Sequence, residues 1–187
     1  AQLDAIDWSV LEQIERKETV NERGVFAPLE AVETEEIERR RDEFRELGIK
    51  AIREGKVGAV LLAGGQGTRL GLDRPKGTLN IGIRRELFLF QQLIRNLMDV
   101  TDEAGAYVPL YIMTSNINHD DTQAFFEEHG YFGYPKEYVK FFVQEREPAC
   151  DYQGRVYMES RTRVAMSPNG NGGWFGSMVN AGLLSDI

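Results

Sequence analysis

The sequence predicts an α/β fold in which helices flank a mainly parallel sheet. From residue 57 onward, short apolar runs alternate with stretches of helical periodicity, and the connections between them are short. This alternation implies right-handed crossovers and parallel strands. A glycine-rich loop directly follows the first apolar run. Because open sheets of this kind bind ligands at the carboxyl ends of their strands, we expect the functional residues in the loops that follow the strands.

The first 56 residues differ in pattern and are predicted to form an N-terminal helical segment. Apolar residues recur at helical spacing in residues 3–14, and residues 19–32 contain the glycine and proline typical of a connector. A second helix is predicted from Thr34 to about Arg53. Residues 57–187 are predicted to be the first part of the α/β domain. The chain stops directly after an apolar stretch, so we expect an incomplete sheet and a fragment of a longer protein.

Within residues 57–187, each element is predicted from its apolar pattern. Continuous apolar runs are typical of strands that are buried on both faces. The predicted strands are 57–63, 107–114, 139–143 and a short one at 155–158. The predicted helices are 86–98, 120–128 and 174–184, and residues 167–173 are predicted to be a loop.

Composition and charge exclude several classes of protein. The net charge is −8, and no basic block is free of interleaved acids, which argues against nucleic-acid and anionic-membrane partners. No apolar run approaches the roughly 18 residues that a membrane span requires. The single cysteine, Cys150, cannot form an internal disulfide, and no signal peptide is visible. We therefore expect a cytoplasmic protein.

The densest functional signal is the string LLAGGQGTRLG at residues 61–71, followed by PKG at 75–77. Glycines directly after a strand let the backbone approach a ligand closely, and their N–H groups can surround an anion. Arg69 and Lys76 add two positive charges in an otherwise acidic chain. The pattern favours a phosphorylated ligand over a glycine-rich surface turn with solvated bases.

Two standard nucleotide motifs do not fit this loop. The dinucleotide fingerprint needs a glycine where Leu70 stands, and an acid after the second strand, which instead ends in Thr114 and Ser115. The P-loop places lysine after glycine, whereas Lys76 precedes Gly77. A nucleotide held in another way is therefore the better interpretation.

Five segments carry a family resemblance when they are taken in order. They are the glycine loop with PKG, YIMTS at 111–115, the aromatic stretch 125–133, FFVQ at 141–144 and SPNGNGG at 167–173. Together they resemble the eukaryotic-type UDP-sugar pyrophosphorylases, most closely the UDP-N-acetylhexosamine branch, over about residues 58–187. The resemblance implies a Rossmann-like nucleotidyltransferase fold. It also implies transfer of UMP from UTP to a sugar 1-phosphate, such as N-acetylglucosamine 1-phosphate, which gives a UDP-sugar and pyrophosphate.

The resemblance also implies roles for residues of the glycine loop. Arg69 would neutralise the β- and γ-phosphates, and Lys76 would hold the α-phosphate; these two are the candidate catalytic residues. The alternative for both is an ordinary surface charge. The residues expected to pack against the uridine and its phosphates are Leu62, Ala63, Gly64 and Gly65.

Three later residues complete the site that the resemblance implies. Gln144 would bind the uracil edge, because its amide can both donate and accept hydrogen bonds. Gly170 would approach the base, and Asn171 would approach the base or the sugar at the edge of the pocket. The alternatives are a strand-end cap for Gln144 and a simple turn for Gly170 and Asn171.

The sequence departs from the family pattern in two ways. Glu145 stands where the family usually has a glycine, and its charge could disturb the pocket mouth or change the sugar preference. The family's Mg²⁺-binding aspartate and most of its sugar pocket lie on later segments, beyond residue 187. We therefore expect Mg²⁺ as a cofactor of the full-length enzyme, no metal ligand in this chain, and an inactive 187-residue chain. The alternatives are a non-catalytic nucleotide-binding module of the same fold and an NAD-dependent oxidoreductase. The sequence leaves the sugar and the oligomeric state open.

Overall fold

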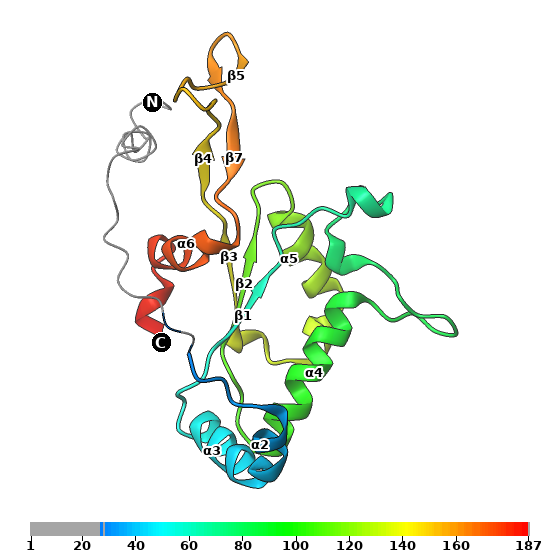
Figure 1. The fold of residues 1–187 in the computed structure, drawn as a ribbon. Coiled ribbons are helices and arrows are strands. Elements are labelled where there is room, and N and C mark those ends of the chain that lie inside the picture. The colour runs from blue at the N-terminus through cyan, green and yellow to red at the C-terminus, as the bar shows by residue number, and fades with distance from the viewer. Residues whose placement is uncertain (1–26, 28, 187) are drawn as a thin grey trace. The chain divides into compact units, whose positions relative to one another are not determined.

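The computed structural model describes residue 27 and residues 29–186, and Figure 1 labels its elements. The chain divides into two compact units. One unit comprises Glu38–Glu145 and the residues from Gly170 onward; the other comprises Arg146–Asn169 and the described residues up to Ile37. The helix predicted at residues 3–14 lies outside the described residues.

The first unit contains a three-stranded parallel sheet, as the sequence predicts. Its strands are β1 (Ala59–Leu62), β2 (Leu110–Thr114) and β3 (Val139–Val143), in the order β1-β2-β3. All five residues of β2 are buried, because this strand has a neighbour on each side and packing on both faces. The predicted boundaries of β3 are confirmed, whereas β1 and β2 are shorter than predicted.

Helices cover the two faces of the sheet (Figure 1). On one face, α4 (Leu89–Ala104) and α5 (His119–Glu128) pack on the sheet through Phe90, Ile94 and Phe126. On the other face, α6 (Trp174–Asn180) contributes the fully buried Met178. The remaining helices are α2 (Thr34–Arg39) and α3 (Arg41–Arg53), which divide the helix predicted at 34–53 near residue 40. Among the described helices, none is both long and apolar enough to cross a membrane.

Two helix boundaries differ from the prediction for local reasons. The helix predicted at 86–98 runs instead over Leu89–Ala104. The segment before it is closed as a loop by the N–H of Ile81, which donates to the carbonyl of Leu87 (2.7 Å). The helix ends at Gly105, whose φ of 65° forms a left-handed C-terminal cap. The helix predicted to extend to residue 184 is interrupted in the same way at Gly182, where φ is 72°.

Short 3-10 helices occupy several connections. They lie at Thr68–Leu70, Lys76–Thr78, Gly130–Gly133, Lys136–Tyr138, Asn171–Gly173 and Leu183–Asp186.

The second unit is built from antiparallel strands, which the sequence did not predict. Strand β4 (Arg146–Pro148) pairs with β7 (Met166–Pro168), and β5 (Met158–Ser160) pairs with β6 (Arg163–Val164). The strand predicted at 155–158 overlaps β5 only at Met158, and Val156 forms an isolated antiparallel bridge with Cys150. The loop predicted at 167–173 begins inside β7.

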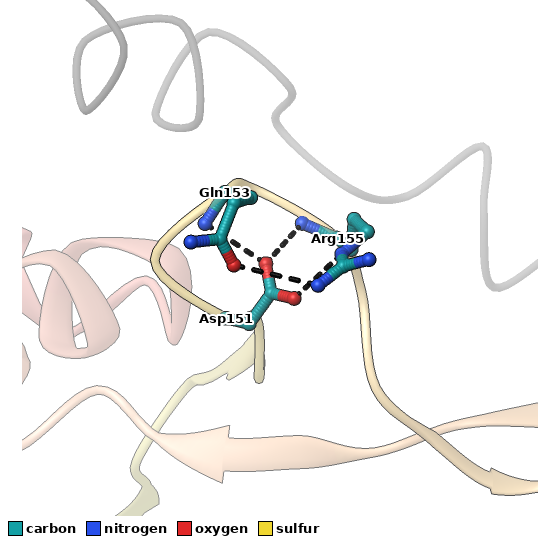
Figure 2. Close-up of polar contacts among 3 residues, drawn as sticks. All are labelled: Asp151, Gln153 and Arg155. Carbon is teal, nitrogen blue, oxygen red and sulfur yellow. Dashed lines mark hydrogen bonds and ion pairs between the residues drawn. The ribbon is translucent and has the colours of Figure 1, made fainter.

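A turn centred on Asp151 accounts for the error at 155–158 (Figure 2). One carboxylate oxygen, Oδ1, accepts hydrogen bonds from the backbone N–H groups of Gln153 and Arg155, both at 2.9 Å. The other oxygen, Oδ2, accepts from Nε of Arg155 at 2.7 Å. Residues 151–155 thus form a side-chain-closed turn, and the strand begins only after it.

The turn predicts a pH dependence for this unit. The backbone N–H of Arg155 donates to the Asp151 carboxylate and, with the Arg155 side chain and the N–H of Gln153, lowers the pKa of Asp151. A group whose pKa is lower in the folded state stabilises that state above its unfolded pKa. The contribution is lost as the pH falls through the folded pKa. In an NMR titration of side-chain carboxyl carbons, Asp151 should titrate below the usual range of an aspartate.

The Arg155→Ala variant provides the comparison. It should raise the titration midpoint of Asp151 only part of the way toward the usual range of an aspartate, because the backbone donors remain. An Asp151 midpoint in the ordinary aspartate range in the unmodified chain would contradict this description of the turn.

Candidate functional site

The predicted site residues gather where the three parallel strands end. Residues 63–67 follow β1, residues 115–118 follow β2, and residues 144–145 follow β3. Because the strands are parallel and adjacent, their carboxyl ends lie at one edge of the sheet. This edge is the candidate site.

After β1, the glycine loop folds back so that the PKG turn lies against the start of the loop. The N–H of Ala63 donates to the carbonyl of Met113 (2.7 Å), which continues the pairing of β1 with β2. Further along, the N–H of Lys76 donates to the carbonyl of Gly65 (3.3 Å). The PKG turn therefore lies against the start of the loop, although ten residues separate Gly65 from Lys76 in the sequence.

Four of the predicted residues line one pocket. This pocket has a volume of about 210 Å³ and lies between the end of β1, the PKG turn and the start of α4. The predicted residues among its lining are Leu62, Ala63, Gly65 and Lys76. The lysine is exposed, and its charge is available at the rim of a largely apolar pocket.

Three other predicted residues meet at the end of β3. Gln144 is 8% exposed, and its backbone N–H donates to the carbonyl of Thr114 (2.7 Å). Its side-chain Nε2 donates to the carbonyl of Gly170 (2.7 Å). Its Oε1 lies 3.0 Å from the position that a Cβ on Gly64 would occupy. Gln144 thus connects the first and the last of the predicted loops.

The two remaining predicted residues are placed less completely. Asn171 is exposed and begins the short helix Asn171–Gly173, directly after Gly170. The backbone of Arg69 lies in the short helix Thr68–Leu70, and its side chain lies outside the described part of the chain.

Sequence reasoning missed one residue of this edge, Asn118. Its side chain is fully buried, and its Oδ1 accepts from the backbone N–H (2.8 Å) and the hydroxyl (3.0 Å) of Ser115. Its Nδ2 donates to the carbonyls of Ala63 (3.0 Å) and Gly65 (3.4 Å). Asn118 therefore fastens the glycine loop to the end of β2. The only signal in the sequence is an asparagine directly before a helix, which is typical of a helix cap.

The glycine loop also holds a buried acceptor that has no partner. Oε1 of Gln66 is buried without a hydrogen bond from the described residues. An unpaired buried acceptor costs roughly 1–3 kcal/mol. A donor from a water molecule would remove that cost.

The candidate site lacks the ligands of a metal centre. In the part of the chain that the structure describes, no three His, Cys, Asp or Glu side chains are grouped so that they could hold a metal ion. The described residues at this edge include neutral amides, backbone groups, Lys76 and the carboxylate of Glu145.

Comparisons with known proteins agree with the geometry. A family model described as UTP–glucose-1-phosphate uridylyltransferase matches residues 2–187. The UDP-N-acetylglucosamine pyrophosphorylase of Saccharomyces cerevisiae is 40% identical over 154 residues, which cover 80% of this chain and 32% of that protein. The human UDP-N-acetylhexosamine pyrophosphorylase-like protein 1 is 37% identical over 153 residues, which cover 79% of this chain and 30% of that protein. The chain therefore spans about a third of the length of these relatives.

Solved structures show the same relationship. One is the uridine diphosphate N-acetylglucosamine pyrophosphorylase of Trypanosoma brucei, solved with an inhibitor, which is 36% identical and superposes with a TM-score of 0.66. The match covers 78% of this chain and 30% of that chain. Another is the putative UDP-N-acetylglucosamine pyrophosphorylase of Entamoeba histolytica, which is 27% identical and superposes with a TM-score of 0.73. The match covers 87% of this chain and 42% of that chain. These similarities confirm the resemblance and the fold that the sequence predicts.

Asn118→Ala should destabilise the chain by about 1–3 kcal/mol, because it leaves the carbonyl of Ala63 and the N–H of Ser115 without their partner. It also removes one of the two donors to the carbonyl of Gly65. Urea denaturation measures the effect. The control is Asn116→Ala, an exposed neighbour of the same type. Equal stability of the two variants would contradict the role assigned to Asn118.

Gly77→Ala should destabilise the chain by roughly 1–3 kcal/mol through overpacking. A Cβ on the buried Gly77 would stand 2.1 Å from the ring of Phe90 in the core. Gly48→Ala is the matched control, because Gly48 lies in α3 with nothing within 4 Å of a Cβ. That variant should be about 0.5–1 kcal/mol more stable than the unmodified chain, since alanine favours helix. Thermal denaturation of both variants tests the pair, and a stable Gly77→Ala variant would contradict the packing.

Proposed function

Because the chain belongs to the UTP–glucose-1-phosphate uridylyltransferase family, we propose that it is the nucleotide-binding part of a uridylyltransferase. In this proposal, residues 57–187 form the first part of the nucleotidyltransferase domain. The whole enzyme transfers UMP from UTP to a sugar 1-phosphate and releases pyrophosphate. The names of the relatives support N-acetylglucosamine 1-phosphate as the sugar phosphate. The single unpaired Cys150 and the acidic composition support a cytoplasmic location.

The observation that carries the proposal is the meeting of Gly64, Gln144 and Gly170 at the end of β3. A buried glutamine amide between two glycine backbones offers a flat, polar edge with little steric hindrance. One N–H of Gln144 is used by Gly170, so its second N–H and its Oε1 remain to pair with a base. The uracil edge presents both an acceptor and a donor, which this amide can match.

The proposed reaction needs no general base. An oxygen of the sugar phosphate attacks the α-phosphorus of UTP and forms the new O–P bond, while the bond from that phosphorus to the β-phosphate oxygen breaks. Pyrophosphate leaves with the electron pair. The nucleophile is already anionic near neutral pH, so no proton is transferred. Catalysis then depends on positioning and on neutralisation of charge.

The residues of the glycine loop provide these two effects in the proposal. Lys76 holds the α-phosphate from the rim of the pocket that it shares with Leu62, Ala63 and Gly65. Arg69 neutralises the leaving β- and γ-phosphates. Asn171 contacts the base or the sugar next to Gly170.

Family members of this type use Mg²⁺, which would neutralise phosphate charge. The described residues do not fit a metal site, since they contain no group of three potential ligands. We therefore derive no step through the ion.

Binding of nucleotides by the folded chain tests the proposal. Calorimetric titration in the presence of Mg²⁺ should show that UTP binds more tightly than CTP, ATP or NAD. Gln144→Ala should abolish the preference for UTP over CTP, because the amide that distinguishes the two pyrimidine edges is lost. Lys76→Ala should weaken UTP binding roughly tenfold or more, because a charge-assisted hydrogen bond to phosphate is worth about 1.5–3 kcal/mol.

The control for charge is Lys56→Ala, an exposed lysine paired with Glu54 and absent from the pocket lining. Its UTP affinity should equal that of the unmodified chain. NAD bound more tightly than UTP would favour the oxidoreductase alternative. Equal binding of all four nucleotides by a folded chain would refute the uridylyltransferase proposal. Selective UTP binding by a full-length protein that shows no turnover would favour a non-catalytic module.

A further inference from the structure

Glu145 directly follows Gln144 at the end of β3, and both its backbone and its side chain contact α6. Its backbone N–H donates to Oγ of Ser177 (3.0 Å). Its carboxylate Oε1 accepts a hydrogen bond from Nδ2 of Asn180. The other carboxylate oxygen, Oε2, lies 3.8 Å from the position that a Cβ on Gly176 would occupy. Both carboxylate oxygens therefore lie against α6.

The two contacts on α6 belong to one face of that helix. Ser177 and Asn180 are three residues apart, a spacing that places them side by side on a helix surface. Ser177 is buried, and its hydroxyl donates to the carbonyl of Gly173 (3.0 Å). The N–H of Gly173 in turn donates to the carbonyl of Gly170 (3.3 Å). A chain of hydrogen bonds thus connects the end of β3, through α6, to the segment Gly170–Gly173.

The side chain of Glu145 supplies a hydrogen-bond acceptor, which a glycine at this position lacks. Any residue provides the backbone N–H that bonds to Ser177, so that contact is independent of residue type. The bond to Asn180 requires a side chain with an acceptor. The same strand end also holds Gly170 directly, through the Gln144 side chain. The Gln144 side chain therefore holds the Gly170 end of the segment, the backbone N–H of Glu145 reaches the Gly173 end through Ser177, and the Glu145 side chain adds a bond to Asn180 at the other end of α6.

We infer that Glu145 is a positioning residue that, through Asn180, holds α6 and the preceding Gly170–Gly173 segment in place beside Gln144. The inference rests on the proposed function, in which Gly170 and Asn171 contact the nucleotide or the sugar. A binding-site segment that is already ordered before the ligand binds loses less conformational entropy on binding. The carboxylate of Glu145 lies against α6. It acts through the helix.

The charge of Glu145 is not the property that the inference requires. The carboxylate lies beside the last residue of α6, where the helix dipole presents its negative end. A neutral amide oxygen would accept the same hydrogen bond from Asn180 without this repulsion. The Glu145→Gln variant should therefore keep the contact, whereas Glu145→Ala and Glu145→Gly should lose it.

Amide hydrogen exchange of the ligand-free chain tests the contact without any nucleotide. In Glu145→Ala, the amide of Gly173 should exchange several-fold faster than in the unmodified chain, while amides of β2 exchange at unchanged rates. Glu145→Gln should restore the slow exchange. Unchanged exchange at Gly173 in Glu145→Ala would overturn the inference. Because no ligand is used, this outcome is separate from the failure of the proposed function.

Calorimetric titration with UTP then tests the consequence for binding. Glu145→Ala and Asn180→Ala should each weaken UTP binding about 5–20-fold, and the double variant should bind no more weakly than either single variant. Glu145→Gln should bind as the unmodified chain does. Additive losses in the double variant, or a loss in Glu145→Gln equal to that in Glu145→Ala, would overturn the inference.

Glu137→Ala is the matched control, because Glu137 is an exposed acid at the opposite end of β3. It should change neither Gly173 exchange nor UTP affinity. If the unmodified chain binds no UTP, the proposed function fails, and the exchange experiment still decides whether Glu145 positions the segment.

Discussion

Two buried side-chain amides hold together the edge of the parallel sheet that carries the candidate site, and the other contacts of this edge depend on them. Asn118 joins the loop after β2 to the carbonyls of Ala63 and Gly65. Gln144 joins the end of β3 to Gly170. The carbonyl of Gly65 also accepts the N–H of Lys76, so the position of the lysine follows from the position of the loop. Parallel strands end in unpaired backbone groups, and an amide can satisfy them because it carries both donors and acceptors.

The glycines of this edge are needed for space as much as for flexibility. At Gly64 a side chain would crowd Oε1 of Gln144, and at Gly77 it would overlap the ring of Phe90. In both cases the close approach brings a loop against a buried side chain, and it leaves backbone groups facing the site. The glycine content that marks the loop in the sequence therefore reports close packing at these two positions.

The sequence predicted the parallel sheet because continuous apolar runs are local signals. The family resemblance, and not the local pattern, placed Gln144 and Gly170 in one site, and a hydrogen bond joins these two residues although they lie 26 positions apart in the sequence. The role of Asn118 could not be predicted. Its donors bond to carbonyls more than fifty residues earlier in the chain, and locally it resembles a helix cap.

Backbone conformation set the other limit on prediction. Tyr131 and Phe132 both adopt left-handed conformations, with φ of 54° and 55°, which bulky residues rarely take. Aromatic packing of Phe132 on Phe126 accompanies this turn. Such a conformation is selected by tertiary contacts and not by the local sequence. The antiparallel unit escaped prediction for a related reason, since the Asp151 turn that precedes β5 is closed by side-chain hydrogen bonds.

The use of neutral groups in the framework also explains how an acidic chain can present a site for an anion. The net charge of −8 opposes the approach of a triphosphate. Buried charged side chains in place of Asn118 and Gln144 would carry a large desolvation cost, and a carboxylate there would also compete with an anionic ligand for Lys76. With neutral amides in those places, the positive charge of Lys76 is not consumed by the framework. The one carboxylate that follows β3 directly, that of Glu145, is bonded to Asn180 on α6. In the proposed function, this arrangement leaves Lys76 to interact with a phosphate.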